Sequence, residues 1–123
     1  MICDVDHLKQ INDTHGHATG DVVLIETGRV LARQGFAGRL GGDKLALWLD
    51  GGATDPQEVA LTIVQEVTTS LAGTSAAAPA SSVSIGIALT PHHGSKIGGL
   101  LAVADAALYE AKAAGRRSAR LAA

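Results

Sequence analysis

The sequence has very few aromatic residues: Phe, Trp and Tyr together make up 2% of its 123 residues, with one of each. Hydrophobic residues nevertheless account for 46% of the chain. The scarcity of rings excludes a core built on aromatic packing, so the core must consist of Leu, Val, Ile and Ala side chains. A chain of this length is sufficient for one domain with one core.

Cysteine is almost absent as well. Cys3 is the only one, which excludes a disulfide within the chain and is compatible with a reducing cytoplasm. No apolar run approaches the roughly 20 residues of a membrane helix. Asp4 and Asp6 stand where a signal peptide would need basic and apolar residues. We therefore expect a cytoplasmic chain with no membrane contact of its own, although a longer parent protein can be anchored elsewhere.

The sequence also lacks an extended block of basic residues. The formal net charge is −2, and the one short basic run is "GRRSAR" near the C-terminus. This balance argues against nucleic acid as a partner, but it is compatible with a small anionic ligand.

The hydrophobic pattern predicts strands that alternate with helices. We expect Thr19 or Asp21 to cap the second helix and Asp55 to cap the third, and we expect Gly28 to mark close packing. One adjacent pair of strands forms a hairpin, which predicts an α/β (α+β) sandwich of ferredoxin or polymerase-palm type, with a mixed, mainly antiparallel sheet flanked by helices. The expected strands are 1–5, 35–40, 44–50 and 81–90; the expected helices are 7–13, 20–34, 55–73 and 97–115, with a loop at 74–80.

Three acids lie at strand ends and turns. Asp4 and Asp6 follow the first apolar run, and Asp43 lies in the turn of the predicted hairpin. If the first strand and the hairpin are neighbours, Asp4 and Asp43 converge, and two carboxylates together with substrate phosphates form a typical Mg²⁺ site. The alternative is that these acids simply face water at strand ends.

The hairpin turn contains two glycines, Gly41 and Gly42. Glycine tolerates the positive φ of a tight turn and allows a ligand to approach the backbone. A plain hairpin turn explains both residues equally well.

Several other polar residues suit a nucleotide. Lys9, Lys112, Arg116 and Arg117 are candidates for phosphate contacts, although the last three lie at a helix C-terminus, where the helix dipole alone favours cations. Asn12 and Asp21 have the amide and carboxylate groups that read a guanine edge, and turn and capping roles explain them too.

Four blocks in this order resemble the GGDEF-domain family, the diguanylate cyclases. The segment "DVDHLKQINDTHGHATGD" is similar to the family's D-x-D-x-F-K-x-I-N-D-x-x-G-H-x-x-G-D, and "RLGGDKL" stands where the family has R-x-G-G-D/E-E-F. The strand "VSIGIA" and the helix "ADAALYEAKAAGR" resemble two further family blocks. The resemblance covers nearly the whole chain.

This resemblance implies a nucleotide-cyclase-like palm fold and the condensation of two GTP molecules into cyclic di-GMP by two facing subunits. Mg²⁺ or Mn²⁺ ions would bridge the phosphates. The metal-binding residues that it implies are Asp4, the backbone carbonyl of Val5 and Asp43, of which Asp43 is also the catalytic acid. The nucleotide-binding residues that it implies are Leu8, Lys9, Asn12, Asp21, Gly41, Gly42, Lys112 and Arg116.

Lys44 departs from the family pattern, because the family has a metal-binding glutamate at this position. At about 4 Å and an effective dielectric near 20, each pair of unit charges contributes about 4 kcal/mol. Reversing the charge beside a dication therefore costs on the order of 10 kcal/mol before screening. Lys44 can alternatively hold the phosphates directly or point to solvent.

The resemblance predicts a single GGDEF-like domain over residues 1–123, without the family's N-terminal D-x-L-T-x-L-x-N-R segment. With Lys44 in place, we expect a degenerate domain without diguanylate cyclase activity that binds GTP or acts in regulation or interaction in cyclic di-GMP signalling. Its partner would be a second copy or another signalling domain. Two alternatives stay open: a cyclase of low activity, and an interaction module with no nucleotide site.

Overall fold

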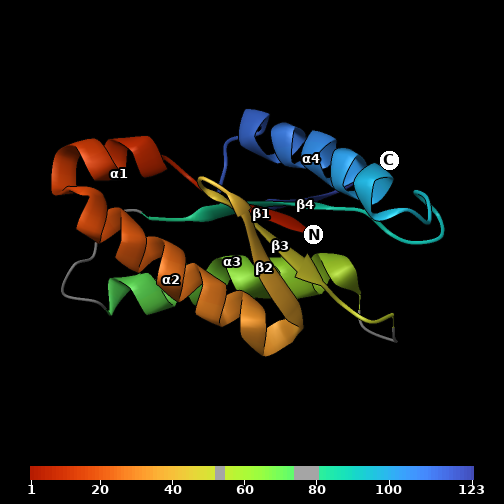
Figure 1. The fold of residues 1–123 in the computed structure, drawn as a ribbon, viewed down its shortest axis with the longest axis horizontal. Helices are drawn as coiled ribbons and strands as arrows, with labels where there is room; N and C mark the ends of the chain where they lie inside the picture. Colours follow the sequence, from red (N-terminus) through yellow and green to blue (C-terminus); the bar gives the residue numbers. More distant parts are fainter. Residues whose placement is uncertain (52–54, 74–80) are drawn as a thin grey trace.

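The computed structural model describes residues 1–51, 55–73 and 81–123, and these form strands and helices in the order β-α-α-β-β-α-β-α-β (Figure 1). The order matches the prediction up to the last helix. The loop expected at 74–80 lies outside the described residues. The strands are β1 (Ile2–Val5), β2 (Phe36–Gly41), β3 (Lys44–Trp48), β4 (Val83–Ile87) and β5 (Ala119–Leu121); the helices are α1 (Leu8–His15), α2 (His17–Gln34), α3 (Pro56–Ala72) and α4 (Ile97–Ala113).

The strands form one sheet in the order β2-β3-β1-β4-β5, so that β1 is central. Every pairing is antiparallel except that of β4 with β5. Helices α2 and α3 pack on one face of this sheet, and α4 packs on the other (Figure 1). The predicted mixed, mainly antiparallel sheet flanked by helices is confirmed.

Alternation along β1 divides its side chains between the two faces. Cys3 and Val5 belong to the larger core shared with α2 and α3, whereas Ile2 packs with Ala104 and Leu108 of α4. Asp4 shares the face of Ile2 and is therefore directed toward α4.

The start of α2 differs from the prediction. The helix begins at His17, and the residue before it, Gly16, has φ 90° and supplies no side-chain cap. Thr19 lies inside the helix and donates to the carbonyl of His15, and Asp21 is an exposed residue of the same helix. The expectation that Thr19 or Asp21 caps the helix is wrong, because a glycine turn already sets the chain direction there. Asp55 does cap α3, accepting from the amide of Gln57 at 2.9 Å.

Two further expectations need correction. A Cβ added at Gly28 would meet nothing within 4 Å, so this glycine does not mark close packing. Strand β5 was not predicted: its three residues carry no alternating pattern, and they pair with β4 in parallel at the edge of the sheet. None of the helices in the described part of the chain is long and apolar enough to cross a membrane.

Helix α4 approaches the sheet closely at Gly86 of β4. A Cβ there would lie 2.0 Å from the carbonyl oxygen of Ala104 and 2.4 Å from the amide nitrogen of Leu108. The glycine therefore sets how closely α4, which carries part of the candidate site, packs on β4.

We predict that Gly86→Ala lowers the free energy of unfolding by about 3 kcal/mol, because the backbone of α4 has to move. The matched variant Gly28→Ala is expected to raise it by about 0.5–1 kcal/mol, because alanine is the better helix residue and meets no neighbour. Urea unfolding of both variants checks this pair. Equal stability of the two variants would contradict it.

Candidate functional site

The pairing of β1 with β3 brings the two candidate acids together. Asp4 lies opposite Lys44 in the antiparallel register, and the amide of Val5 donates to the carbonyl of Asp43 at 3.2 Å. The predicted convergence of Asp4 and Asp43 is therefore present. It results from the first strand and the hairpin being neighbours in the sheet.

The turn of the hairpin depends on glycine for its conformation. Gly41 has φ 151° and Gly42 has φ 52°, both in the range that side chains disfavour. Arg39 donates from Nε and Nη2 to the carbonyl of Gly42, at 3.1 and 2.7 Å. Arg39 therefore braces the turn that carries Asp43, a contact that was not predicted from the sequence.

A hollow of about 310 Å³ opens beside the two acids. Its walls come from the end of β1, the hairpin and α4. Asp4 is 2% exposed, and its Oδ1 atom is buried with no hydrogen-bond partner. An unpaired, buried carboxylate oxygen next to a second carboxylate is a position suited to a cation. The residues that line the hollow are Asp4, Asp43, Lys44, Asp105, Leu108, Tyr109 and Lys112.

The environment of Asp4 raises the pKa of its carboxyl to about 6. Burial is the largest cause, and the nearby Asp43 carboxyl raises the pKa further, while the hydrogen bond from Lys112 lowers it. A negative charge at Asp4 is therefore only partly compensated.

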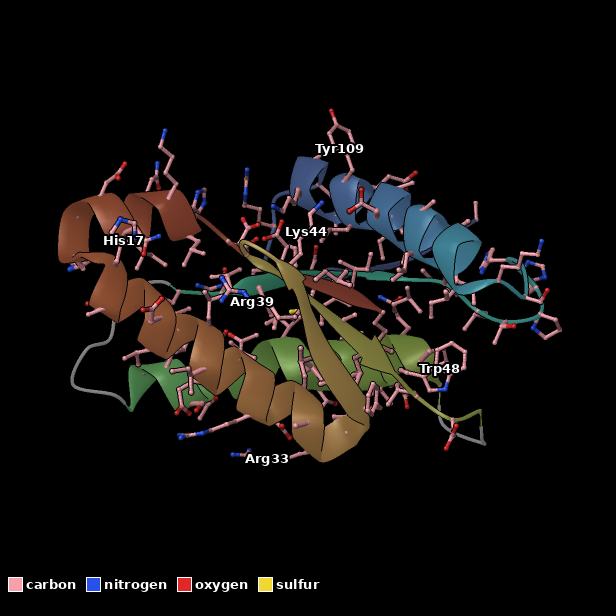
Figure 2. The ribbon with its side chains drawn as sticks, viewed as in Figure 1. His17, Arg33, Arg39, Lys44, Trp48 and Tyr109 are labelled. Carbon is pink, nitrogen blue, oxygen red and sulfur yellow. The ribbon has the colours of Figure 1, made fainter. Side chains whose placement is uncertain are left out.

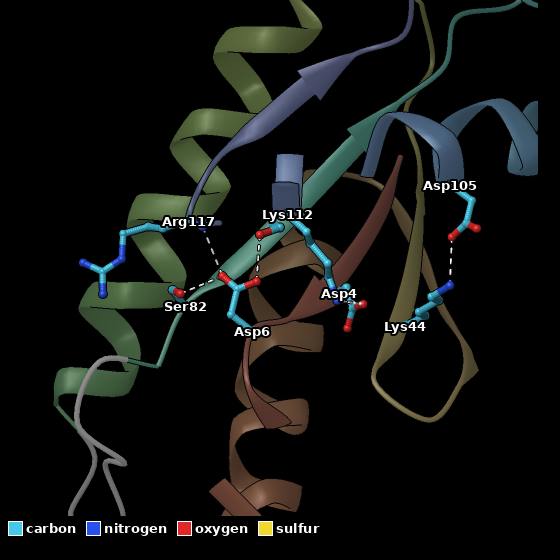
Figure 3. A network of polar contacts seen from close by, with 8 residues as sticks. Asp4, Asp6, Lys44, Ser82, Asp105, Lys112 and Arg117 are labelled. Carbon is cyan, nitrogen blue, oxygen red and sulfur yellow. Dashed lines mark hydrogen bonds and ion pairs between the residues drawn. The ribbon is translucent and has the colours of Figure 1, made fainter. Parts of the chain in front are cut away.

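Two lysines line the hollow, and each has a carboxylate partner (Figure 3). Lys112 extends from α4 and bonds Oδ2 of Asp4. Lys44 extends from the hairpin and bonds Oδ1 of Asp105 at 2.8 Å. The contact with Asp105 is the main cause of the raised pKa of Lys44. The Lys44 ammonium thus lies in an exposed ion pair with Asp105 on the rim of the hollow.

Asp6 has a structural role. Its carboxylate accepts from the hydroxyls of Ser82 and Ser84, both at 2.7 Å, and from the amide of Arg117 at 3.1 Å (Figure 3). It is 1% exposed. These bonds tie β1, β4 and the segment after α4 together, so of the first two acids only Asp4 is open to a ligand.

Asn12 of α1 lies against Gly20 of α2. A Cβ at Gly20 would lie 1.8 Å from Oδ1 of Asn12, so the absence of a side chain at residue 20 makes room for this amide. The Oδ1 atom of Asn12 is buried and has no hydrogen-bond partner. Leu8 lies next to them and packs against the larger core. The amide is therefore held near the junction of α1 and α2.

The remaining predicted residues do not line the hollow. Lys9 and Asp21 are exposed on α1 and α2, and Arg116 is exposed in the turn after α4 with φ 63°. The structure brings Asp4, Asp43, Lys44 and Lys112 together. It places Leu8 and Asn12 at the junction of α1 and α2, with Lys9 and Asp21 on the same two helices.

A second, larger hollow of about 860 Å³ contains none of the predicted site residues. Its lining is mainly apolar and includes Trp48, which lies at the other end of β3 from Lys44 (Figure 2). The two candidate metal-binding acids, Asp4 and Asp43, line only the smaller, charged hollow.

Comparison with known proteins identifies the family. Residues 1–118 match the family of the diguanylate cyclase GGDEF domain. The diguanylate cyclase TpbB from Pseudomonas aeruginosa is 35% identical over 128 residues, which cover 99% of this chain and 29% of TpbB. The chain belongs to the GGDEF family.

Solved structures agree with this assignment. The crystal structure of the GGDEF domain of TpbB has a TM-score of 0.80 and 37% identity, covering 99% of this chain and 80% of that one. The coiled coil and GGDEF domain of DgcB from Caulobacter crescentus, solved in complex with c-di-GMP, has a TM-score of 0.83 and 31% identity, covering 98% and 67%. The chain spans between 15% and 66% of the length of the first relatives that it matches.

We predict that Asp4 makes the free energy of unfolding depend on pH in a specific direction. Its folded pKa of about 6 lies above the ordinary value of 3.8, so the native state holds a proton that the unfolded chain has released. This contribution is complete below pH 4 and is lost as the pH rises through 6. As the pH rises from 4 to 7, the free energy of unfolding of Asp4→Asn should therefore increase by on the order of 2–3 kcal/mol relative to that of the native protein.

Urea unfolding at intervals of half a pH unit measures this difference. Asp13→Asn, which removes an exposed carboxylate from α1, is the matched control. If the free energy of unfolding of Asp4→Asn minus that of the native protein stays constant over this range, or falls as the pH rises, the raised pKa of Asp4 is refuted.

Proposed function

We propose that this GGDEF domain binds GTP together with one divalent cation, without condensing GTP into cyclic di-GMP, and that it acts as a regulatory or interaction domain in cyclic di-GMP signalling. In this proposal residues 1–123 act as one module, and the partner is a second copy or another signalling domain. The observation that carries the proposal is the composition of the charged hollow: two adjacent carboxylates, and a lysine where the family has a third.

The residues fit a single cation. Mg²⁺ is usually held in proteins by one or two carboxylates, with substrate phosphates and water completing its coordination. Asp4 and Asp43 supply two carboxylates, and Oδ1 of Asp4 lacks a partner. Among the residues that the structure describes, no three His, Cys, Asp or Glu side chains are grouped so as to hold a metal. When bound, Mg²⁺ or Mn²⁺ would neutralise phosphate charge at this point.

The chain keeps the residue types needed for the nucleotide itself. Gly20 leaves room for the Asn12 amide, which together with Asp21 is suited to hydrogen-bond a guanine edge. Lys9 and Arg116 are exposed cations available to phosphates, and Lys112 already lies in the hollow. Gly41 and Gly42 leave open space in front of the backbone, because a Cβ at either would meet nothing within 4 Å.

The same hollow explains why we expect no condensation. Phosphoryl-transfer sites of the two-metal type place two cations about 4 Å apart, which requires a high density of carboxylates. Here three carboxylates face two ammonium groups, and Lys112 and Lys44 pair with Asp4 and Asp105. The remaining negative charge is too small to hold a second dication beside the first.

We predict that the native protein binds GTP in the presence of Mg²⁺ and that Asn12→Ala weakens this binding at least tenfold, because a hydrogen bond to the base is worth about 1.4 kcal/mol or more. Isothermal titration calorimetry measures the affinity. Asp13→Ala, one residue further along α1 and exposed, is the control. Identical affinities for the native protein and Asn12→Ala would contradict the assignment of the base site.

Incubation with GTP and Mg²⁺ or Mn²⁺ tests the lack of turnover. We predict no cyclic di-GMP from the native sequence and detectable cyclic di-GMP from Lys44→Glu, which adds a carboxylate to the hollow. Lys44→Gln is the control, since it removes the ammonium without adding a metal ligand. Turnover by the native sequence, measured by chromatography of the products, would disprove the proposal and favour the alternative of a cyclase of low activity.

A further inference from the structure

The position of the Lys44 ammonium is set by a contact with a residue of α4. This ammonium bonds Oδ1 of Asp105 at 2.8 Å, across 61 residues of sequence. This pair lies on the rim of the charged hollow, with side-chain exposures of 41% for Lys44 and 51% for Asp105. An ion pair this exposed contributes little to stability by itself, between about 0 and 1 kcal/mol.

The ion pair affects the position of the Lys44 positive charge more than it affects stability. Lys44 lies opposite Asp4 in the β1–β3 register, and Asp43 precedes it in the chain. Both acids already act on the Lys44 ammonium electrostatically. A lysine side chain is long and flexible, so without another partner its ammonium is free to turn toward these two carboxylates and to occupy the position of a cation.

We propose that Asp105 is a positioning residue that holds Lys44 out of the acid pair and so keeps Asp4 and Asp43 available to a divalent cation. This inference rests on the proposed function, whose single cation lies at the same two acids. It reverses the simplest view of Lys44, in which the substitution alone abolishes metal binding. In this proposal the positive charge of Lys44 is offset by Asp105, which lies two helical turns from Lys112 on α4.

Two observations besides the ion pair support this role. Oδ1 of Asp4 is buried, lacks a partner and belongs to a residue lining the hollow, so one coordination position is unfilled by the protein. Asp105 and Lys112 are seven residues apart on α4, which places them on the same helix face. One helix thus supplies the counter-charge for each side of the hollow, Lys112 for Asp4 and Asp105 for Lys44 (Figure 3).

Titration of Mn²⁺ into nucleotide-free protein, followed by electron paramagnetic resonance of the free ion, tests the proposal. Asp105→Asn is expected to weaken Mn²⁺ binding about tenfold, because Lys44 is released toward the acids. The double variant Lys44→Gln with Asp105→Asn is expected to bind within about twofold of the native protein. This variant has the native net charge but neither partner of the ion pair.

Glu110→Gln is the matched control. It also removes one exposed carboxylate from α4, but its partner is Arg120 at 3.9 Å, away from the hollow. We expect it to leave Mn²⁺ affinity unchanged. Equal weakening by Glu110→Gln and Asp105→Asn would show a general charge effect and overturn the proposal.

Two other outcomes would also overturn it. If the double variant binds as weakly as Asp105→Asn, Asp105 does not act through Lys44. If the native protein binds no Mn²⁺, the acid pair is not available to a cation. These titrations contain no nucleotide, so they are independent of GTP binding. If the Mn²⁺ affinities of the variants differ from those expected while GTP still binds, this inference alone is rejected. If the Mn²⁺ affinities are as expected but GTP does not bind, the proposed function alone is rejected.

Discussion

The antiparallel register between β1 and β3 is the constraint on which the candidate site depends. It sets Asp4 opposite Lys44 and brings the Val5 amide to the carbonyl of Asp43. A slip of one residue would turn Asp4 toward the apolar core and Cys3 toward α4. Because Cys3 and Val5 are fully buried among aliphatic side chains, such a slip would place a carboxylate in the core, and the register is strongly specified.

Helix α4 completes the site because it packs closely on the sheet. Gly86 permits the contact, and Lys112 and Asp105 project from the helix toward the acids and the hairpin. Two ion pairs line the hollow, Lys112 with Asp4 and Lys44 with Asp105. Asp43 is the remaining carboxylate of the hollow and has no lysine partner among these pairs. On this basis we propose that the site holds one cation and is not blocked by Lys44.

Much of this arrangement was predictable from the sequence, because it follows from local patterns. The hairpin, the cap at Asp55 and the convergence of Asp4 with Asp43 all come from glycine positions, capping residues and the order of strands. The elements that were missed depend on tertiary contacts. Strand β5 is three residues long and pairs with the edge of β4, and α2 begins at a glycine turn rather than at a polar cap. The Lys44–Asp105 pair joins residues 61 positions apart, and nothing in the composition of either segment indicates it.

We have proposed that the acid pair of this GGDEF domain holds one cation while Lys44 stays on Asp105. A crystal structure of the complex with GTP and Mn²⁺, with an anomalous difference map at the manganese edge, tests it most directly. We expect one peak, between Asp4 and Asp43, with the Lys44 ammonium still bonded to Asp105. Two manganese peaks, or a Lys44 ammonium lying between the two carboxylates with no peak at all, would contradict it.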